Sequence, residues 1–229
     1  MNQELSLTAN LLGDPGRAAI LLSLMDGLAL PAGELASIAN VAPQTASGHL
    51  ARLIDGGLLS VERQGRHRYY RLSSPEVADA IEALLVVSAR PKSQERTVPT
   101  HTVTAGSLAH ARTCYAHLAG WLGVQIAQEL EHRGSLRVSG AKLYTIRPSG
   151  RIWFQSLGID IPEDTPDRHA RRCLDWTERR HHLAGPLGFS MYKRLVELRW
   201  VAPIRGTRAV RVTLEGKRRL WESLRIPIG

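Results

Sequence analysis

The segment Pro31–Leu72 decides the fold of the first part of this chain: PAGELASIANVAPQTASGHLARLIDGGLLSVERQGRHRYYRL. Apolar residues recur in it at intervals of three and four, which is the spacing of one helix face. They form two short runs, Leu35/Ile38 and Ala46/Leu50/Leu53. Only Asn40-Val41-Ala42 separates the runs, and Pro43 suits the first turn of a second helix, where an N–H has no helical partner. The segment therefore predicts a helix-turn-helix unit.

A basic hairpin is predicted directly after the second helix. Gly56-Gly57 ends that helix, residues 58–63 alternate as a strand does, and Gln64-Gly65 provides a turn before a returning strand at 66–72. Such a wing can place its cations on phosphates or in the minor groove of DNA. Ser73-Ser74-Pro75 then begins another helix, which we expect to continue to about Val87.

Three motifs resemble the ArsR/SmtB family of bacterial winged-helix repressors: Ala42–Leu53, Gly56–Leu59 and Gly65–Leu72. The resemblance covers roughly the first 90 residues. It implies a recognition helix over Pro43–Asp55 and a homodimer built from the helices at about Gln3–Leu12 and Val77–Val87. Metal sensors of this family often carry Cys-x-Cys on the first helix of the motif or histidine on the dimerising helix. This chain has neither, so a signal must be sensed elsewhere.

The predicted DNA-binding residues lie on two surfaces. On the second helix they share the face opposite its apolar residues, and on the hairpin they surround the turn. A glutamine can read adenine with two hydrogen bonds, and hydroxyl groups suit bases or phosphates. The predicted set is Gln44, Thr45, Ser47, His49 and Arg52 on the helix, with Arg63, Arg66, His67 and Arg68 on the wing.

Composition supports a nucleic-acid partner. The 229 residues carry a net charge of +9, and the pI is about 10.2. Residues 1–90 hold 7 Lys and Arg against 9 Asp and Glu, whereas residues 91–229 hold 23 against 12, so the second half carries the excess. Two cysteines, no signal peptide and no long apolar run predict a bacterial-type cytoplasmic protein without a membrane partner.

The rest of the chain predicts a duplicated domain. We expect a winged-helix domain over 1–90, a polar linker over 91–106 and an effector domain over 107–229. His117-Leu118-Ala119-Gly120-Trp121-Leu122-Gly123 recurs as His182-Leu183-Ala184-Gly185-Pro186-Leu187-Gly188. The predicted fold class is α+β and helix-rich, with two tandem helix-hairpin-helix units at about 107–160 and 167–229. Degenerate winged-helix units are an equally open interpretation of the same pattern.

Candidates for sensing cluster near these repeats. On a helix, Cys114 and His117 would share a face, as would Glu178 and His182, which makes a mixed site from these four geometrically possible. Thiolate and imidazole favour zinc, copper or nickel. A small organic effector in a pocket lined by Trp121, Trp153 and Trp176 is the alternative. A thiol switch would need Cys114 near Cys173, for which the helical spacing gives no support.

These patterns predict a transcriptional regulator rather than an enzyme. The sequence contains no phosphate-binding glycine motif, no H-E-x-x-H and no G-x-S-x-G. We expect a homodimer that binds specific double-stranded DNA as a repressor and is released by an effector in the C-terminal domain. The alternative is a sequence-indifferent architectural DNA-binding protein without an effector, and comparison of specific with competitor DNA distinguishes the two.

Overall fold

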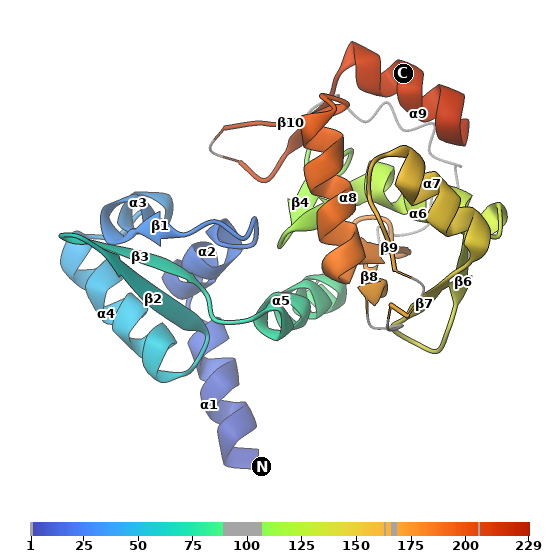
Figure 1. Cartoon of the computed structure of the whole chain (residues 1–229). Coiled ribbons are helices and arrows are strands. Elements are labelled where there is room, and N and C mark those ends of the chain that lie inside the picture. Colours follow the sequence, from blue (N-terminus) through green and yellow to red (C-terminus); the bar gives the residue numbers. More distant parts are fainter. Residues whose placement is uncertain (1, 89–106, 163, 166–168, 206) are drawn as a thin grey trace, which may run out of the picture. The chain divides into compact units, whose positions relative to one another are not determined.

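The computed structural model describes residues 2–88, 107–162, 164–165, 169–205 and 207–229. The chain divides into two compact units, Met1–Ile81 and Glu82–Gly229 (Figure 1). The linker expected at 91–106 lies outside the described residues, as do residues 166–168, where the second repeat was expected to begin.

Unit 1 is a winged helix-turn-helix, as the sequence predicted. Its elements are α1 (Asn2–Leu12), α2 (Pro15–Ser23), β1 (Leu30–Pro31), α3 (Ala32–Ile38), α4 (Pro43–Asp55), β2 (Leu59–Gln64), β3 (His67–Leu72) and the start of α5 (Pro75–Ser88). The bounds of α4 are those expected for the recognition helix. The three strands form one antiparallel sheet in the order β1-β3-β2, and the short strand β1 was not predicted.

Local sequence explains the tight connections in unit 1. Asn40 adopts a left-handed conformation at φ 52° between α3 and α4, which an asparagine tolerates better than most residues. Leu35, Leu50 and Leu53 are buried, so residues of both predicted apolar runs belong to the core of unit 1. Ile38 is the exception to that prediction, because it is 45% exposed at the end of α3.

Unit 2 repeats one order of elements twice. The first copy contains β4 (Arg112–Cys114), β5 (His117–Ala119), α6 (Gly120–His132), β6 (Leu136–Val138), β7 (Tyr144–Ile146) and α7 (Pro148–Ser156). The second contains β8 (Arg171–Leu174), β9 (His181–Ala184), α8 (Gly185–Glu197), β10 (Val201–Pro203), β11 (Val210–Val212) and α9 (Leu214–Leu224). Each strand pair is an antiparallel hairpin. The helical interpretation of the segments around Cys114 and Cys173 was therefore wrong, because both lie in strands.

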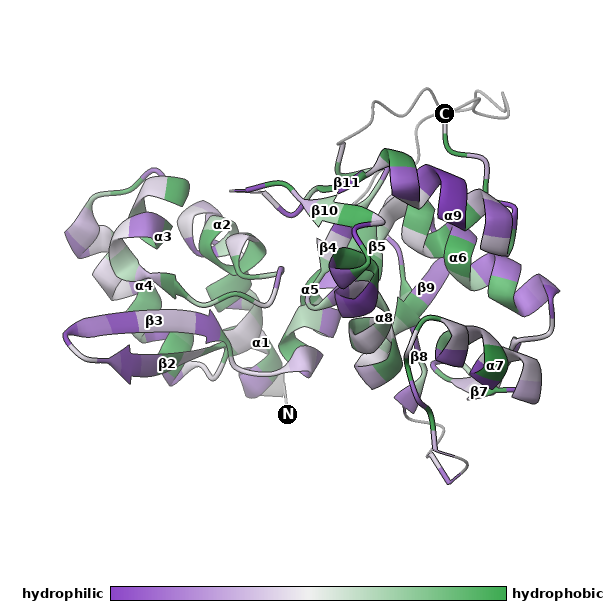
Figure 2. Cartoon of the chain, turned by 45° about the horizontal axis from the view of Figure 1, so that its top comes forward, coloured by the Kyte–Doolittle hydropathy of each residue, from purple (hydrophilic) through white to green (hydrophobic). Residues whose placement is uncertain are grey.

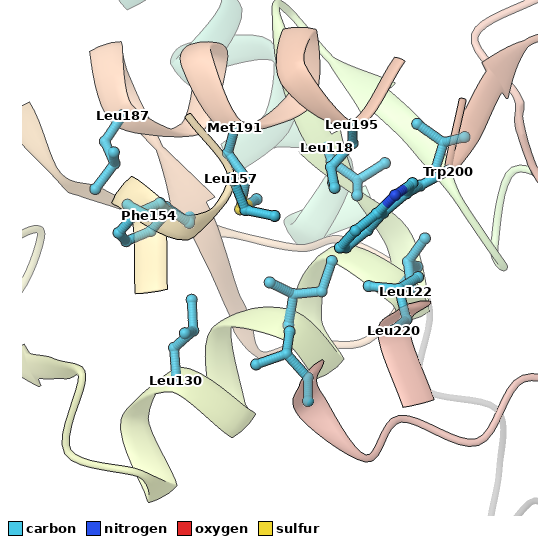
Figure 3. Packing of buried hydrophobic residues seen from close by; sticks show 14 of the residues in the cluster. Leu118, Leu122, Leu130, Phe154, Leu157, Leu187, Met191, Leu195, Trp200 and Leu220 are labelled. Atoms are coloured by element: carbon cyan, nitrogen blue, oxygen red, sulfur yellow. The ribbon is translucent and has the colours of Figure 1, made fainter. Parts of the chain in front are cut away.

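The two copies share a single apolar core. Figure 3 shows Leu118, Leu122, Leu130, Phe154 and Leu157 of the first copy packed with Leu187, Met191, Leu195, Trp200 and Leu220 of the second. All of them are buried. Because the two copies share one core, unit 2 is a single domain and not two separate ones.

In unit 1, the β2–β3 hairpin is largely hydrophilic along its length (Figure 2).

Candidate DNA-binding surface and Cys/His cluster

The recognition helix α4 presents a polar face to solvent. Ala46, Leu50 and Leu53 anchor its other face in the core of unit 1. Gln44, Thr45, Ser47 and Arg52 are all exposed. The Ser47 hydroxyl donates a hydrogen bond to the Pro43 carbonyl at 2.9 Å, and its oxygen keeps the capacity to accept a further hydrogen bond. Four of the five predicted helix residues therefore lie on an accessible surface.

His49 has a different environment from the other four. Its Nε2 lies 3.7 Å from Asp14 Oδ1, and its side chain is only 13% exposed. Asp14 caps α2 by accepting a hydrogen bond from the Arg17 backbone N–H at 2.9 Å. The imidazole thus connects α4 to the start of α2, and this contact gives His49 a role in positioning the helix.

The wing concentrates positive charge at its tip. Its two strands are joined through Gly65, whose φ of 61° suits a glycine in a two-residue turn. Arg66 lies in the turn itself, and Arg63 faces Arg68 directly across the strands. These arginines and His67 are exposed. Like charges directly opposite each other destabilise a hairpin, so this pairing favours a surface that binds a polyanion.

In unit 2, two hairpins bring two cysteines and two histidines together. Cys114 faces His117 across β4 and β5, and Cys173 faces His182 across β8 and β9. The two sulfur atoms are 3.9 Å apart, and the two Nε2 atoms are 3.0 Å apart. One possible ligand atom from each residue lies within 4.8 Å of those of the other three. All four side chains are buried.

A buried carboxylate lies directly behind this cluster. Asp175 Oδ2 is 3.2 Å from Nδ1 of His182 and 3.0 Å from Nη2 of Arg112. The same oxygen accepts a hydrogen bond from the Gly120 N–H at 2.7 Å, and Oδ1 accepts from the Thr177 N–H and hydroxyl. Asp175, Arg112 and His182 are all fully buried. The Asp175 carboxylate thus lies at ion-pair distance from Nδ1 of His182, without the alignment of a hydrogen bond, while Nε2 of the same ring lies in the cluster.

Electrostatics distinguishes the two thiols. The sulfur contact with Cys173, together with burial, raises the pKa of the Cys114 thiol well above its usual value. The same contact lowers the pKa of Cys173 well below its usual value, against the effect of burial and with help from His117 and His182. Burial lowers the pKa of His182, but Asp175 and Cys173 outweigh it and raise that pKa to about 9. The cluster therefore stabilises one thiolate, which is the form that coordinates metals.

Two of the predicted ligand relationships need correction. Glu178 does not belong to the cluster. Its backbone N–H donates to Asp175 Oδ1 at 3.1 Å, in the loop between β8 and β9. Cys173 occupies the fourth position instead. The helical wheel placed Cys173 and His182 on opposite sides, but cross-strand pairing makes them direct neighbours. The expectation that nothing brings Cys114 near Cys173 was wrong for the same reason.

The hairpins could have been found from the repeat itself. The spacing between Cys and His is three in the first copy and nine in the second, which conceals the equivalence of Cys114 and Cys173. Four of the six extra residues lie in the turn, which has two residues, Tyr115-Ala116, in the first copy and six, 175–180, in the second. The other two are Leu174 and His181, an additional cross-strand pair in the second hairpin. Alignment with a gap at this turn pairs cysteine with cysteine and histidine with histidine.

The recurrent glycines hold a helix close to each hairpin. Gly120 and Gly185 adopt φ of 76° and 74° where strand turns into helix. A Cβ on Gly123 would lie 2.5 Å from the Leu118 carbonyl oxygen and 3.5 Å from the His182 Cβ. A Cβ on Gly188 would lie 2.5 Å from the Leu183 carbonyl oxygen and 3.3 Å from the His117 Cβ. Each repeat's helix thus supports the histidine of the other repeat.

The three tryptophans proposed for an organic-effector pocket pack on different partners. Trp121 stacks on His110 with ring centroids 5.2 Å apart. Trp153 makes an edge contact with Phe154 at 4.9 Å. The Arg112 guanidinium lies 5.0 Å over the ring of Trp176. Each ring thus has a packing partner, although the indole N–H groups of Trp153 and Trp176 are buried without a hydrogen-bond partner. The organic-effector pocket stays a prediction.

The sequence is similar to transcriptional regulators, in one case over its whole length. Residues 12–62 match a family model described as a helix-turn-helix domain. The chain is 43% identical over 230 residues to an uncharacterized HTH-type transcriptional regulator, YdfF, of Bacillus subtilis (strain 168), and the alignment covers 100% of both proteins. It is also 36% identical over 76 residues to the HTH-type transcriptional regulator CmtR of Mycobacterium bovis, covering 33% of this chain and 64% of that one.

Two solved structures align with somewhat more than a third of the chain. The NolR structure from Sinorhizobium fredii covers 39% of this chain and 89% of its own, with 26% identity and a TM-score of 0.36. The AntR antimony-specific transcriptional repressor covers 38% of this chain and 78% of its own, with 28% identity and a TM-score of 0.35. Within the described part of the chain, no helix has the length and apolar character needed to cross a membrane.

Proposed function

The chain belongs to the HTH-type transcriptional regulators, with an N-terminal domain of the ArsR/SmtB type. On this basis we propose that it is a sequence-specific repressor, which is released from DNA by an effector bound in unit 2. The observation that carries the DNA-binding part is the exposed polar face of α4 beside an arginine-rich wing. DNA lies in the cytoplasm of a bacterial cell, which is where we place the protein.

The proposed reading of DNA divides between the two elements. Gln44 is exposed near the start of α4, the end of a recognition helix that contacts base edges, and its amide can pair with adenine. Thr45 and Ser47 provide hydroxyls for bases or phosphates on the same face. Arg63, Arg66 and Arg68 supply charge to the backbone, where binding releases counterions and carries no sequence information.

Exposed apolar side chains on α1 and α5 support a homodimer. Leu5 and Leu7 on α1 are 73% and 63% exposed, and Val87 on α5 is 82% exposed. These are the two helices that the family resemblance implies for dimerisation. Leaving such side chains in water is unfavourable, and a second copy that covers them would remove that cost. Two copies would also present two recognition helices to two half-sites.

Release of the repressor requires a route from unit 2 to the winged helix. Helix α5 begins in unit 1, and its residue Glu82 belongs to unit 2. Glu82 lies 4.0 Å from Arg112 and 3.4 Å from Arg208, and Arg112 in turn contacts Asp175 behind the Cys/His cluster. We propose that an effector which alters this ion network changes the position of α5. The effect of such coupling on DNA affinity is reciprocal with the effect of DNA on effector affinity.

The test of specific readout is the substitution Gln44→Ala. Loss of a bidentate base contact costs about 1–3 kcal/mol, so affinity for the operator should fall roughly 5- to 150-fold while affinity for random DNA stays unchanged. The operator is first defined by selection from a random DNA library with the full-length protein. The matched control is Gln155→Ala, because Gln155 is exposed on α7 in unit 2.

Equal losses on operator and random DNA would contradict base readout by Gln44. If the library selection enriched no sequence, the chain would be the sequence-indifferent architectural protein. Both measurements are made by fluorescence anisotropy at one fixed salt concentration, because affinities for DNA depend steeply on salt.

A further inference from the structure

Each repeat of unit 2 contributes one cysteine and one histidine to a shared centre. The pairs come from the two leading hairpins at matching register, Cys114 opposite His117 and Cys173 opposite His182. None of the four ordinary roles of the winged helix (reading bases, binding phosphate, dimerising, positioning α4) uses these residues. Burying four polar or ionisable side chains together in a core costs free energy unless they are paired with one another or coordinate an ion.

We propose that Cys114, His117, Cys173 and His182 bind one zinc ion in a tetrahedral site. With metal–sulfur distances of about 2.3 Å and metal–nitrogen distances of about 2.0–2.1 Å, such a site requires its sulfurs about 3.8 Å apart and its nitrogens about 3.3 Å apart. The sulfurs are 3.9 Å apart and the Nε2 atoms 3.0 Å apart. Small side-chain movements within the hairpins therefore suffice to coordinate the ion.

The donor set selects the class of metal. Two thiolates and two imidazoles in tetrahedral arrangement suit zinc, whereas magnesium and calcium require oxygen ligands. The exposed fractions of the four residues run from 0% for His182 to 8% for Cys173, so no coordination position faces bulk water. Sites with four protein ligands and no open position are structural rather than catalytic. The ion would join the two repeats at their leading hairpins.

The surroundings of the cluster match those of a metal site. Metal-binding histidines commonly donate their second ring N–H to a carboxylate, which fixes the tautomer and orients the ring. Asp175 occupies that place at 3.2 Å from His182 Nδ1, and Arg112 and Gly120 hold Asp175 in turn. Gly123 and Gly188 allow α6 and α8 to press against the two histidines. Both ring positions are thus defined before any ion binds.

The same contacts connect the site to the regulatory proposal. Asp175 contacts both His182 and Arg112, and Arg112 approaches Glu82 of α5. Occupancy of the site would therefore alter the network that we assigned to release, which makes a zinc-like cation the effector class that unit 2 fits best. This assignment of the effector rests on the proposed function, whereas the metal site itself does not.

The metal site is tested on the full-length protein without DNA. The chain is purified under reducing conditions, equilibrated with Zn²⁺ or Co²⁺ and desalted, and its metal content is measured by mass spectrometry. We expect one equivalent of either metal. The Co²⁺ form should show the intense ligand-field bands of tetrahedral cobalt and a thiolate-to-cobalt charge-transfer band, which report geometry and sulfur ligation independently of stability.

Variants of the ligands and of a neighbour identify the site. Cys114→Ser and His182→Gln should no longer retain one equivalent of bound metal after desalting. Asp175→Asn should lower the affinity for zinc about 10- to 100-fold. The matched control is Glu178→Gln, because Glu178 lies in the same β8–β9 loop and outside the cluster. This control should keep one equivalent and an unchanged cobalt spectrum.

Several results would overturn the proposal. The wild-type chain could bind no metal, or a ligand variant could retain the full equivalent and the thiolate band. A protein isolated without reductant that is two hydrogen masses lighter and lacks titratable thiols would show a Cys114–Cys173 disulfide in place of the metal. Since the Gln44→Ala experiment measures only DNA, failure of either test leaves the other intact.

Discussion

Alanine at Gly123 should destabilise unit 2, although alanine ordinarily strengthens a helix. Gly123 lies inside α6, where replacement of glycine by alanine contributes about 1 kcal/mol of helix stability. The new Cβ, however, would lie 2.5 Å from the Leu118 carbonyl oxygen and 2.8 Å from its carbon, both backbone atoms that cannot rotate away. Overpacking of this kind typically costs about 1–3 kcal/mol, and a clash with backbone atoms lies toward the upper end, so we expect a net loss of up to about 2 kcal/mol.

The melting temperature reports this loss. For a unit of this size, about 1 kcal/mol shifts the melting temperature by roughly 2–4 °C, so Gly123→Ala should lower the transition of unit 2 by up to about 8 °C. Gly188→Ala should do the same, because its Cβ meets the Leu183 carbonyl at the same 2.5 Å. Calorimetry of the full-length chain measures both variants under identical metal and reductant conditions.

A third glycine provides the matched control. Gly48 lies inside α4, and a Cβ there would meet nothing within 4 Å. Gly48→Ala should therefore raise the transition of unit 1, by about 4–8 °C for a stabilisation near 1 kcal/mol in a small unit. If Gly123→Ala and Gly188→Ala raised the melting temperature as Gly48→Ala does, the close approach of helix to hairpin would be refuted.

Arg66→Ala should weaken operator and random DNA equally and reduce the slope of log affinity against log salt by about one unit, because Arg66 is an exposed cation in the wing turn; an unchanged slope would place it away from phosphate. Asp175→Ala should cost unit 2 about 3–5 kcal/mol in denaturant unfolding, because it leaves the fully buried Arg112 without its closest carboxylate; a loss below about 1 kcal/mol would argue against that ion pair. Acid should destabilise unit 2 through His110, whose pKa is lowered from 6.5 by burial and by Lys217. The unfolded chain then binds more protons, so stability falls as pH drops below about 6.5, and His110→Gln should reduce that fall while His132→Gln, at an exposed position, should not.

The winged helix was predictable because its signals are local. Pro43 at the start of α4 and Gly65 in the wing turn each restrict the backbone directly, and the buried faces of α3 and α4 follow from apolar spacing. The same reasoning failed at Ile38, since a single apolar residue at a helix end has no periodic neighbours to fix its environment. The short strand β1 was missed because two residues carry no alternation.

The cluster in unit 2 was only half predictable. The repeat identified His117 and His182 as equivalent residues, and Cys114 was predicted to be a metal ligand together with them. Periodicity could not find the hairpins, because strands of three or four residues are too short to distinguish two-residue alternation from a helical turn. Cys173 was excluded on helical geometry, and only cross-strand pairing places it beside His182. Strand pairing of this kind is not visible to apolar periodicity, and only alignment of the two repeats with a gap at the turn would have indicated it.

Duplication has an evolutionary consequence for the cluster. Each repeat contributes one cysteine and one histidine to the cluster. An ancestor with a single copy could therefore have assembled all four side chains only by associating with a second chain. Fusion of two genes would convert that intermolecular contact into an intramolecular one and free each copy to diverge. The six-residue turn that carries Asp175 and Thr177 exists in the second copy alone, whereas the first copy kept a two-residue turn. The present asymmetry beside His182 is therefore one that an obligate symmetric ancestor could not have confined to one side.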